Sequence, residues 1–193
     1  MNNKNTVRKI AVCGVFAAII CVISFLPIRT LGLEITLSMV PVAIGATVFG
    51  PAIGSVLGGV FGVISFIQCF GFSPFGATLL SINAFYTALV CIPTRILAGF
   101  LAGVVASAAA KKETLSLVLG SILAPVLNTV FFMSALCLAF YNTEYIQGFV
   151  SALGAVNPIM FILLFVGING LVEIIAGAVI ALPAAKAVKH SIK

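Results

Sequence analysis

Charged residues are scarce in this sequence. Its 193 residues include 10 Lys and Arg and 4 Asp and Glu, so that only 7% of the chain is charged. Soluble globular domains carry about 25% charged residues, and so few charges cannot cover the surface of a water-soluble particle of 20.0 kDa. Hydrophobic residues make up 62% of the chain, and the mean hydropathy is +1.31. The composition excludes a water-soluble fold and predicts an integral membrane protein.

Residue types that carry out chemistry are also few. His190 is the single histidine and lies in a charged tail, so no Ser-His-Asp set can form. The sequence has no HExxH motif, no paired carboxylates within one hydrophobic run, and no GxxxxGK(S/T) loop for ATP hydrolysis. The five cysteines form no CxxC pair and predict small packed side chains rather than a metal site or disulfides: Cys13, Cys21, Cys69, Cys91 and Cys137. We predict a protein that is not an enzyme and needs no metal or cofactor.

Long hydrophobic runs, separated by turn-forming or charged residues, predict six membrane-spanning helices. A span needs about 20 residues, so 193 residues accommodate one all-α membrane domain, 1–193, and leave no room for a separate soluble domain. The predicted spans are about 7–26, 37–49, 52–70, 80–110, 115–141 and 158–185. Semi-polar or turn-rich connections are expected at 27–38, 71–76 and 142–156. The expected architecture is a compact bundle of six transmembrane helices.

The basic residues predict the orientation of this bundle. Cytoplasmic loops of membrane proteins collect Lys and Arg, which accounts for the net charge of +6 without a nucleic-acid partner. With both termini in the cytoplasm, the basic residues on that side are Lys4, Arg8, Lys9, Lys111, Lys112, Lys186, Lys189 and Lys193. An odd number of spans would place the basic C-terminal tail outside. Six spans with both termini inside is therefore the consistent solution.

Two series of small residues predict close helix packing. The first recurs every four positions at Ala46, Gly50, Gly54, Gly58 and Gly62; the second comprises Ala98, Ala102, Ala106 and Ala110, beside Gly99 and Gly103. In lipid, small residues at this spacing let two helix backbones approach closely and gain dispersion energy. We expect both series to form contacts within the bundle.

Polar residues within the predicted spans converge on one level of the membrane. A helical rise of about 1.5 Å per residue places Arg95 about 24 Å, and Glu173 and Asn128 about 20 Å, from the cytoplasmic end. Asn169 lies one turn outward of Glu173 on the same helix face. Ionisable residues at this depth are costly and rare. Two interpretations remain open: an Arg95–Glu173 ion pair that locks two helices, or a polar cavity open to the outside in which Arg95 binds a ligand carboxylate.

Residues near the outer ends of the spans are further candidates for ligand contact. The loop 69–75 carries Phe72 and Phe75, which would form either a lid over an apolar ligand or an anchor at the membrane interface. Gln68 and Asn83 are nearby polar candidates, whereas Asn157 is expected to cap the last span. The predicted binding residues are Arg95, Asn128, Asn169, Glu173, Asn83, Gln68, Phe72 and Phe75.

The whole pattern resembles the substrate-binding S component of energy-coupling factor (ECF) transporters. The similar stretches are Gly45–Gly62 (GATVFGPAIGSVLGGVFG), Pro93–Gly103 (PTRILAGFLAG), Asn128–Met133 (NTVFFM) and Asn169–Glu173 (NGLVE). The resemblance implies a multi-pass protein of the bacterial plasma membrane that captures a water-soluble vitamin from outside. It also implies a separate transmembrane coupling subunit and two cytoplasmic ATPase subunits as partners.

The resemblance implies a contact surface and a substrate as well. In that family a small-xxx-small pattern on the first helix contacts the coupling subunit, and Gly14, Ala17, Ala18 and Cys21 occupy the matching positions. The usual pattern has alanine at both positions, so Gly14 departs from it. The PTRILAG stretch looks most like pantothenate-type members, with Arg95 for the carboxylate. Other vitamins such as riboflavin or folate, a self-sufficient secondary transporter and a structural membrane protein without ligand remain alternatives.

Overall fold

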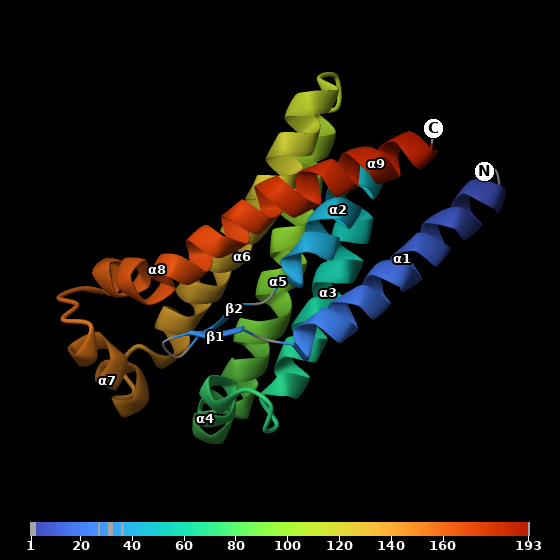
Figure 1. Cartoon of the computed structure of the whole chain (residues 1–193). Coiled ribbons are helices and arrows are strands. Elements are labelled where there is room, and N and C mark those ends of the chain that lie inside the picture. The colour runs from blue at the N-terminus through green and yellow to red at the C-terminus, as the bar shows by residue number, and fades with distance from the viewer. Residues whose placement is uncertain (1–2, 27, 31–32, 36, 193) are drawn as a thin grey trace.

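The computed structural model describes residues 3–26, 28–30, 33–35 and 37–192, and the chain is helical apart from one short antiparallel hairpin (Figure 1). The elements are α1 (Asn3–Ser24), β1 (Ile28–Thr30), β2 (Leu33–Ile35), α2 (Met39–Phe49), α3 (Pro51–Gln68), α4 (Pro74–Ile82), α5 (Ala84–Ala108), α6 (Glu113–Phe140), α7 (Glu144–Ala152), α8 (Pro158–Ala176), the π-helical segment η1 (Gly177–Ala181) and α9 (Leu182–Ile192). Together the helices form an elongated bundle.

Among the residues that the structure describes, four helices are long and apolar enough to cross a membrane. They are Pro51–Gln68, Ala84–Ala108, Glu113–Phe140 and Asn169–Ser191. The same described ranges also contain three shorter apolar helices: Ile10–Ser24, Met39–Phe49 and Pro158–Gly167. The prediction of a helical membrane bundle is confirmed, whereas six spans and both termini inside remain predictions.

The structure interrupts several segments that the sequence analysis treats as continuous. The predicted span 80–110 is divided at Asn83, where an extended backbone (φ −159°, ψ 103°) separates α4 from α5. The last predicted span is broken at Gly167 (φ 31°, ψ −115°) before it continues through η1 into α9. The connections expected at 27–38 and 142–156 contain the hairpin and α7, respectively.

The small-residue series bring α3 and α5 into backbone contact, as predicted. A methyl group added at Gly54 or Gly58 would overlap the backbone carbonyl of Gly99 or Arg95 on α5. Further along, a Cβ at Gly62 would lie 2.9 Å from the Cys91 carbonyl oxygen. Such close approach allows dispersion contacts between residues 51–62 of α3 and residues 91–103 of α5. It also determines which residues of α3 face Arg95.

Two clusters of buried apolar side chains lie at successive levels of the α5–α6 pair. The first includes Ala98 and Ala102 of α5 with Leu117 and Ala124 of α6, packed against α1, α2 and α3. The second includes Val90 of α5 with Met133, Leu136 and Phe140 of α6, packed against α4, α7 and α8. The α5 and α6 residues between these levels include Arg95 and Asn128. The polar level predicted from the sequence therefore lies between two apolar cores.

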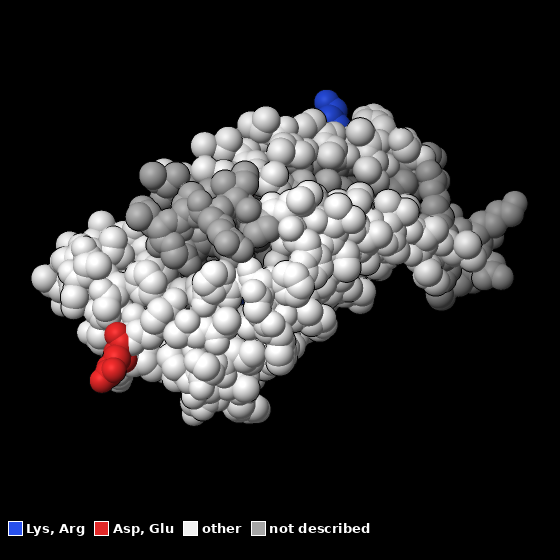
Figure 2. Space-filling view, turned by 60° about the horizontal axis from the view of Figure 1, so that its bottom comes forward, with Lys and Arg blue, Asp and Glu red and all other residues white. Residues whose placement is uncertain are grey.

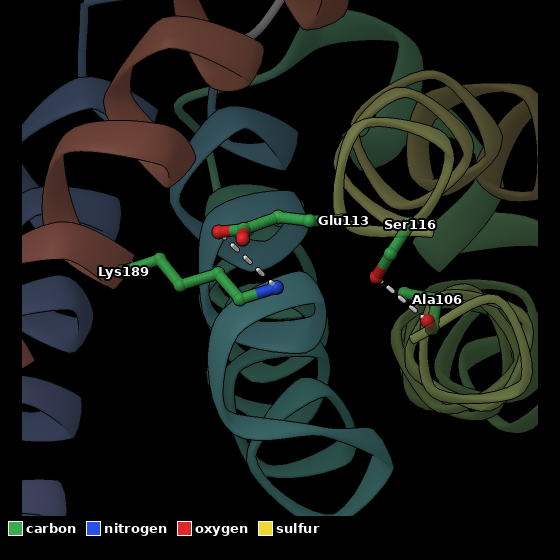
Figure 3. Close-up of polar contacts among 4 residues, drawn as sticks. All are labelled: Ala106, Glu113, Ser116 and Lys189. Atoms are coloured by element: carbon green, nitrogen blue, oxygen red, sulfur yellow. Dashed lines mark hydrogen bonds and ion pairs between the residues drawn. The ribbon is translucent and has the colours of Figure 1, made fainter. Parts of the chain in front are cut away.

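The C-terminal helix and the turn between α5 and α6 share one end of the molecule, where Figure 1 also places the N-terminus. Lys189 Nζ of α9 lies 3.8 Å from Glu113 Oε1 of α6, and nearby Ser116 Oγ donates a 2.7 Å hydrogen bond to the Ala106 carbonyl (Figure 3). Among the described residues, the face in Figure 2 shows few charged side chains. Lys193 and the side chains of Lys4, Arg8 and Lys9 lie outside the described residues.

Candidate ligand-binding cavity

A cavity opens among α3, α4, α5, α6 and α8. Counted out to its open mouth, it has an empty volume of about 940 Å³. Its polar wall is formed by Ser65, Gln68, Cys69, Ser73, Thr87, Cys91, Arg95, Asn128, Thr129, Asn169 and Glu173; its apolar wall is formed by Phe61, Phe75, Gly76, Leu79, Val90, Phe132, Met133, Val166 and Gly170. A concave site with apolar walls and several placed polar groups is typical of small-molecule sites.

Arg95 is held in the cavity wall by contacts on several sides. Its side chain is only 7% exposed. Nη1 donates to the carbonyl oxygens of Cys91 (2.9 Å) and Val90 (3.3 Å), so the side chain runs back toward the N-terminal end of α5. The guanidinium carbon lies 4.8 Å from the Phe61 ring centroid and 5.0 Å from that of Phe132. Because each cation–π contact contributes about 0.5–2 kcal/mol, the charged group is fixed before any ligand arrives.

The helix around Arg95 is locally modified. Pro93 removes a backbone N–H from the interior of α5, which is one cause of bent helices. Thr94 Oγ1 donates 2.5 Å to the Val90 carbonyl, which also accepts from Arg95. The side chains of Thr94 and Arg95 thus donate hydrogen bonds to backbone carbonyl groups one turn earlier in α5. These bonds orient Arg95 toward the cavity.

Two polar atoms of the wall have no hydrogen-bond partner among the described residues. They are Nε of Arg95, a donor, and Oδ1 of Asn128, an acceptor, whose side chain is 8% exposed. Leaving a buried polar group unsatisfied costs about 1–3 kcal/mol, and more for a charged group. The two atoms belong to different helices that line one cavity. A small shift of the cavity wall on binding would therefore offer one donor and one acceptor to a bound molecule.

The structure brings Arg95, Asn128, Asn169 and Glu173 to the same cavity, as the helical rise predicts. Asn169 is buried and Glu173 half-buried, and both come from the helix segment that follows the break at Gly167. The Glu173 carboxylate also acts electrostatically on the Arg95 guanidinium. The cavity interpretation and the ion-pair interpretation therefore both involve Arg95 and Glu173.

The remaining predicted binding residues divide into two groups. Gln68 and Phe75 line the cavity, although Nε2 of Gln68 donates to the Ser24 carbonyl of α1. Asn83 is exposed and does not line it, because its Oδ1 accepts the Tyr86 N–H at 3.0 Å and caps α5. Phe72 also lies outside it, with its ring 5.3 Å from that of Phe25 and 58% of the residue exposed. Asn83 and Phe72 are therefore close in sequence to residues that line the cavity but do not line it themselves.

Several lining residues were not predicted. Cys91 lies one helical turn before Arg95, and Phe61, Ser65 and Cys69 recur at four-residue spacing on α3. Residues four apart share a helix face, so this spacing is a signal in the sequence once the face is known. The described residues contain no group of three or more His, Cys, Asp or Glu that could hold a metal ion.

Phe75, which lines the cavity, packs among aromatic side chains of α7 and α8. The ring of Phe75 on α4 lies 5.8 Å from Tyr145 and 6.1 Å from Phe149 of α7, and 5.7 Å from Phe165 of α8. Aromatic pairs at these distances contribute about 0.5–1.5 kcal/mol each beyond their buried area. Phe75 therefore links α4 to the helices that follow α6, while lining the cavity.

Comparison with known proteins agrees with this architecture. A search of curated protein sequences found no match. A family model for the ECF transporter substrate-specific component matches residues 8–185, which is most of the chain. Proteins of this family are substrate-binding subunits of membrane transporters rather than enzymes. With its membrane-spanning helices and a polar cavity between two apolar cores, the chain belongs to the family of ECF transporter substrate-specific components.

Proposed function

We propose that this protein binds a water-soluble vitamin with a carboxylate group, pantothenate in the first place, in the cavity beside Arg95. Arg95 would accept the carboxylate, because the guanidinium presents parallel N–H donors that match two carboxylate oxygens. Asn128 and Asn169 would contact the amide and hydroxyl groups of the ligand. The unpartnered pair of Arg95 Nε and Asn128 Oδ1 is the observation that carries this proposal.

The same pair of atoms favours some vitamins over others. A ligand that satisfies both must combine an anionic acceptor with a hydroxyl or amide donor, and pantothenate carries both on a flexible chain. Riboflavin has no carboxylate for Arg95. Folate carries carboxylates but presents a large planar ring system, which would need a stacking surface. The rings of Phe61 and Phe132 already stack against the Arg95 guanidinium, so they do not offer a free stacking surface to that ring system.

We propose that the bound vitamin is delivered through a separate transmembrane coupling subunit and two cytoplasmic ATPase subunits, in a bacterial plasma membrane that the single domain crosses six times. The exposed small residues of α1 support this partnership. Gly14, Ala18 and Cys21 are exposed, Ala17 is half-buried, and a Cβ at Gly14 would have no atom within 4 Å beyond its chain neighbours and its own helix backbone. Such a stripe lets a partner helix approach closely.

Thermal unfolding of the detergent-purified chain with a panel of vitamins tests the binding proposal. A ligand that binds only the folded chain stabilises it by about 2.7 kcal/mol at a hundredfold excess over Kd. Pantothenate is expected to raise the unfolding temperature of the natural chain. The control variant Asn83→Ser should respond in the same way, because serine can still cap α5 and residue 83 lies outside the cavity. Arg95→Gln should abolish the rise.

The outcomes separate the two interpretations of Arg95. A folded Arg95→Gln chain that has lost the vitamin response supports the binding role. Absence of any vitamin response in the natural chain, together with a large loss of stability in Arg95→Gln and Glu173→Gln, supports a structural ion pair instead. A response to a different vitamin would replace pantothenate and retain the receptor.

A further inference from the structure

Two buried cysteines lie beside Arg95, and the vitamin-binding proposal does not use them. Cys69 ends α3 and Cys91 lies within α5; they are 4% and 5% exposed, and both line the cavity. Neither is in a disulfide. Their side chains are hydrogen-bonded to each other, and Cys91 Sγ also lies 4.0 Å from the Ser65 hydroxyl oxygen. Two sulfur atoms from separate helices therefore meet at one point of the cavity.

Three neighbouring residues, Ser65, Gly76 and Arg95, accommodate the two sulfur atoms. Cys69 Sγ is 3.3 Å from the Ser65 carbonyl oxygen. A Cβ at Gly76 of α4 would lie only 2.6 Å from Cys69 Sγ, so the absence of a side chain at Gly76 leaves room for the sulfur. The Arg95 guanidinium donates to the Cys91 carbonyl and acts electrostatically on the Cys91 side chain. A permanent positive charge thus lies next to the thiols.

We propose that Cys69 and Cys91 form a two-sulfur site for a soft monovalent cation of the copper(I) and silver(I) class. Soft thiolate ligands select such ions, and d10 monovalent ions accept two opposed ligands without requiring more. Tetrahedral zinc needs four ligands, whereas the described part of the chain gathers no third His, Cys, Asp or Glu at this point. The number and kind of ligands therefore match a two-coordinate soft ion.

The charge balance of the site involves Arg95. Binding replaces both thiol protons with one cation: two Cys–SH groups and M⁺ give an S–M–S unit of net charge −1 and release two protons. Metal binding by thiols is coupled to proton release in this way. The positive Arg95 neutralises the remaining negative charge in the buried site. Loss of such a neighbouring partner typically weakens metal affinity by roughly 10- to 100-fold.

Silver(I) retention in the presence of excess glutathione tests the site. Glutathione, a soluble single thiol, removes silver from isolated cysteines, whereas two sulfur atoms on one chain hold the ion together. The reduced chain is loaded with silver nitrate, mixed with glutathione and desalted, and the silver per chain is measured. About one silver per chain is expected for the natural protein, and the same for the control variants Cys21→Ser and Cys137→Ser.

Variants of the two cysteines and of Arg95 decide the outcome. Cys69→Ser and Cys91→Ser should each lose the retained silver, and Arg95→Gln should weaken retention roughly 10- to 100-fold. No retention by the natural chain, or unchanged retention by Cys69→Ser and Cys91→Ser, would overturn the site. The measurement contains no vitamin, so its result is independent of the vitamin-binding proposal.

A second measurement uses only the natural chain and avoids any folding defect of the variants. Dibromobimane joins two thiols that lie within reach of one small molecule. Peptide mapping after this treatment should recover Cys69 and Cys91 in one cross-linked adduct, and prior loading with silver should prevent it. Cross-links among other cysteines, or none at all, would refute the proximity on which the site depends.

Discussion

Replacing Gly58 by alanine is expected to push α3 away from α5, whereas the same change at Gly59 is not. A Cβ at Gly58 would lie 2.9 Å from the Arg95 carbonyl carbon and 3.3 Å from the Ile96 Cα, and it would overlap the Arg95 carbonyl oxygen. All three atoms are backbone, which cannot turn aside as a side chain does. A Cβ at Gly59 meets only side-chain atoms of Ile96, at 3.5 and 3.8 Å, which is ordinary van der Waals contact.

The pair of variants isolates the cost of this overlap. Either glycine gains about 0.8–1.0 kcal/mol of helix propensity when it becomes alanine, and this gain cancels in the comparison. Forcing extra atoms into a packed interface costs about 1–3 kcal/mol. Gly58→Ala should therefore be less stable than Gly59→Ala by about 1–3 kcal/mol, which corresponds to roughly 2–12 °C in unfolding temperature for a chain of this length.

Thermal unfolding of both variants in the same detergent measures the difference. Gly58→Ala should also weaken ligand binding. Phe61 lies one turn from Gly58 on α3, and its ring centroid is 4.8 Å from the Arg95 guanidinium carbon. Vitamin-induced stabilisation should be weaker in Gly58→Ala than in Gly59→Ala. Equal unfolding temperatures, or a lower one for Gly59→Ala, would refute the close approach of α3 and α5 at Gly58.

Three further predictions concern the surface and the helix ends. Gly14→Leu should leave stability and vitamin binding unchanged but prevent co-purification with the coupling subunit; normal co-purification would remove α1 from that interface. Asn157 Oδ1 accepts the Met160 N–H at 2.7 Å, so Asn157→Ala should lower stability by about 0.5–2 kcal/mol in thermal unfolding, and Asn157→Ser should largely restore it. Lys189 and Glu113 are 24% and 41% exposed, so Lys189→Ala should change stability by no more than about 1 kcal/mol; a larger loss would show that this contact holds α9 in place.

The convergence of Arg95, Asn128, Asn169 and Glu173 could be predicted because a helix advances by a constant rise. Once the charged ends of the spans are identified, the number of residues gives the depth of each polar side chain. The small-residue series predicted the α3–α5 contact for a similar reason, since four-residue spacing places small residues on one helix face. Both inferences use only the regular geometry of the helix.

Asn83 and Phe72 show where such reasoning ends. Both lie near the outer ends of predicted spans, but depth alone does not say which way a side chain points. The Asn83 side chain accepts a hydrogen bond from the Tyr86 backbone N–H, because α5 begins there and Asn83 is its N-cap. Phe72 packs on Phe25 of the segment that follows α1. Helix ends and loops do not share the fixed period of the helix.

The sequence by itself determined that the chain is a helical membrane protein with a polar level around Arg95, because composition and helical rise need no knowledge of neighbours. Only the tertiary structure decided that two apolar cores leave a cavity at this level, and that Nε of Arg95 and Oδ1 of Asn128 lack partners there among the described residues. It also decided that Cys69 meets Cys91. The physical reason is that contacts between helices depend on rotation and crossing, which are set by packing of the whole bundle rather than by any local stretch.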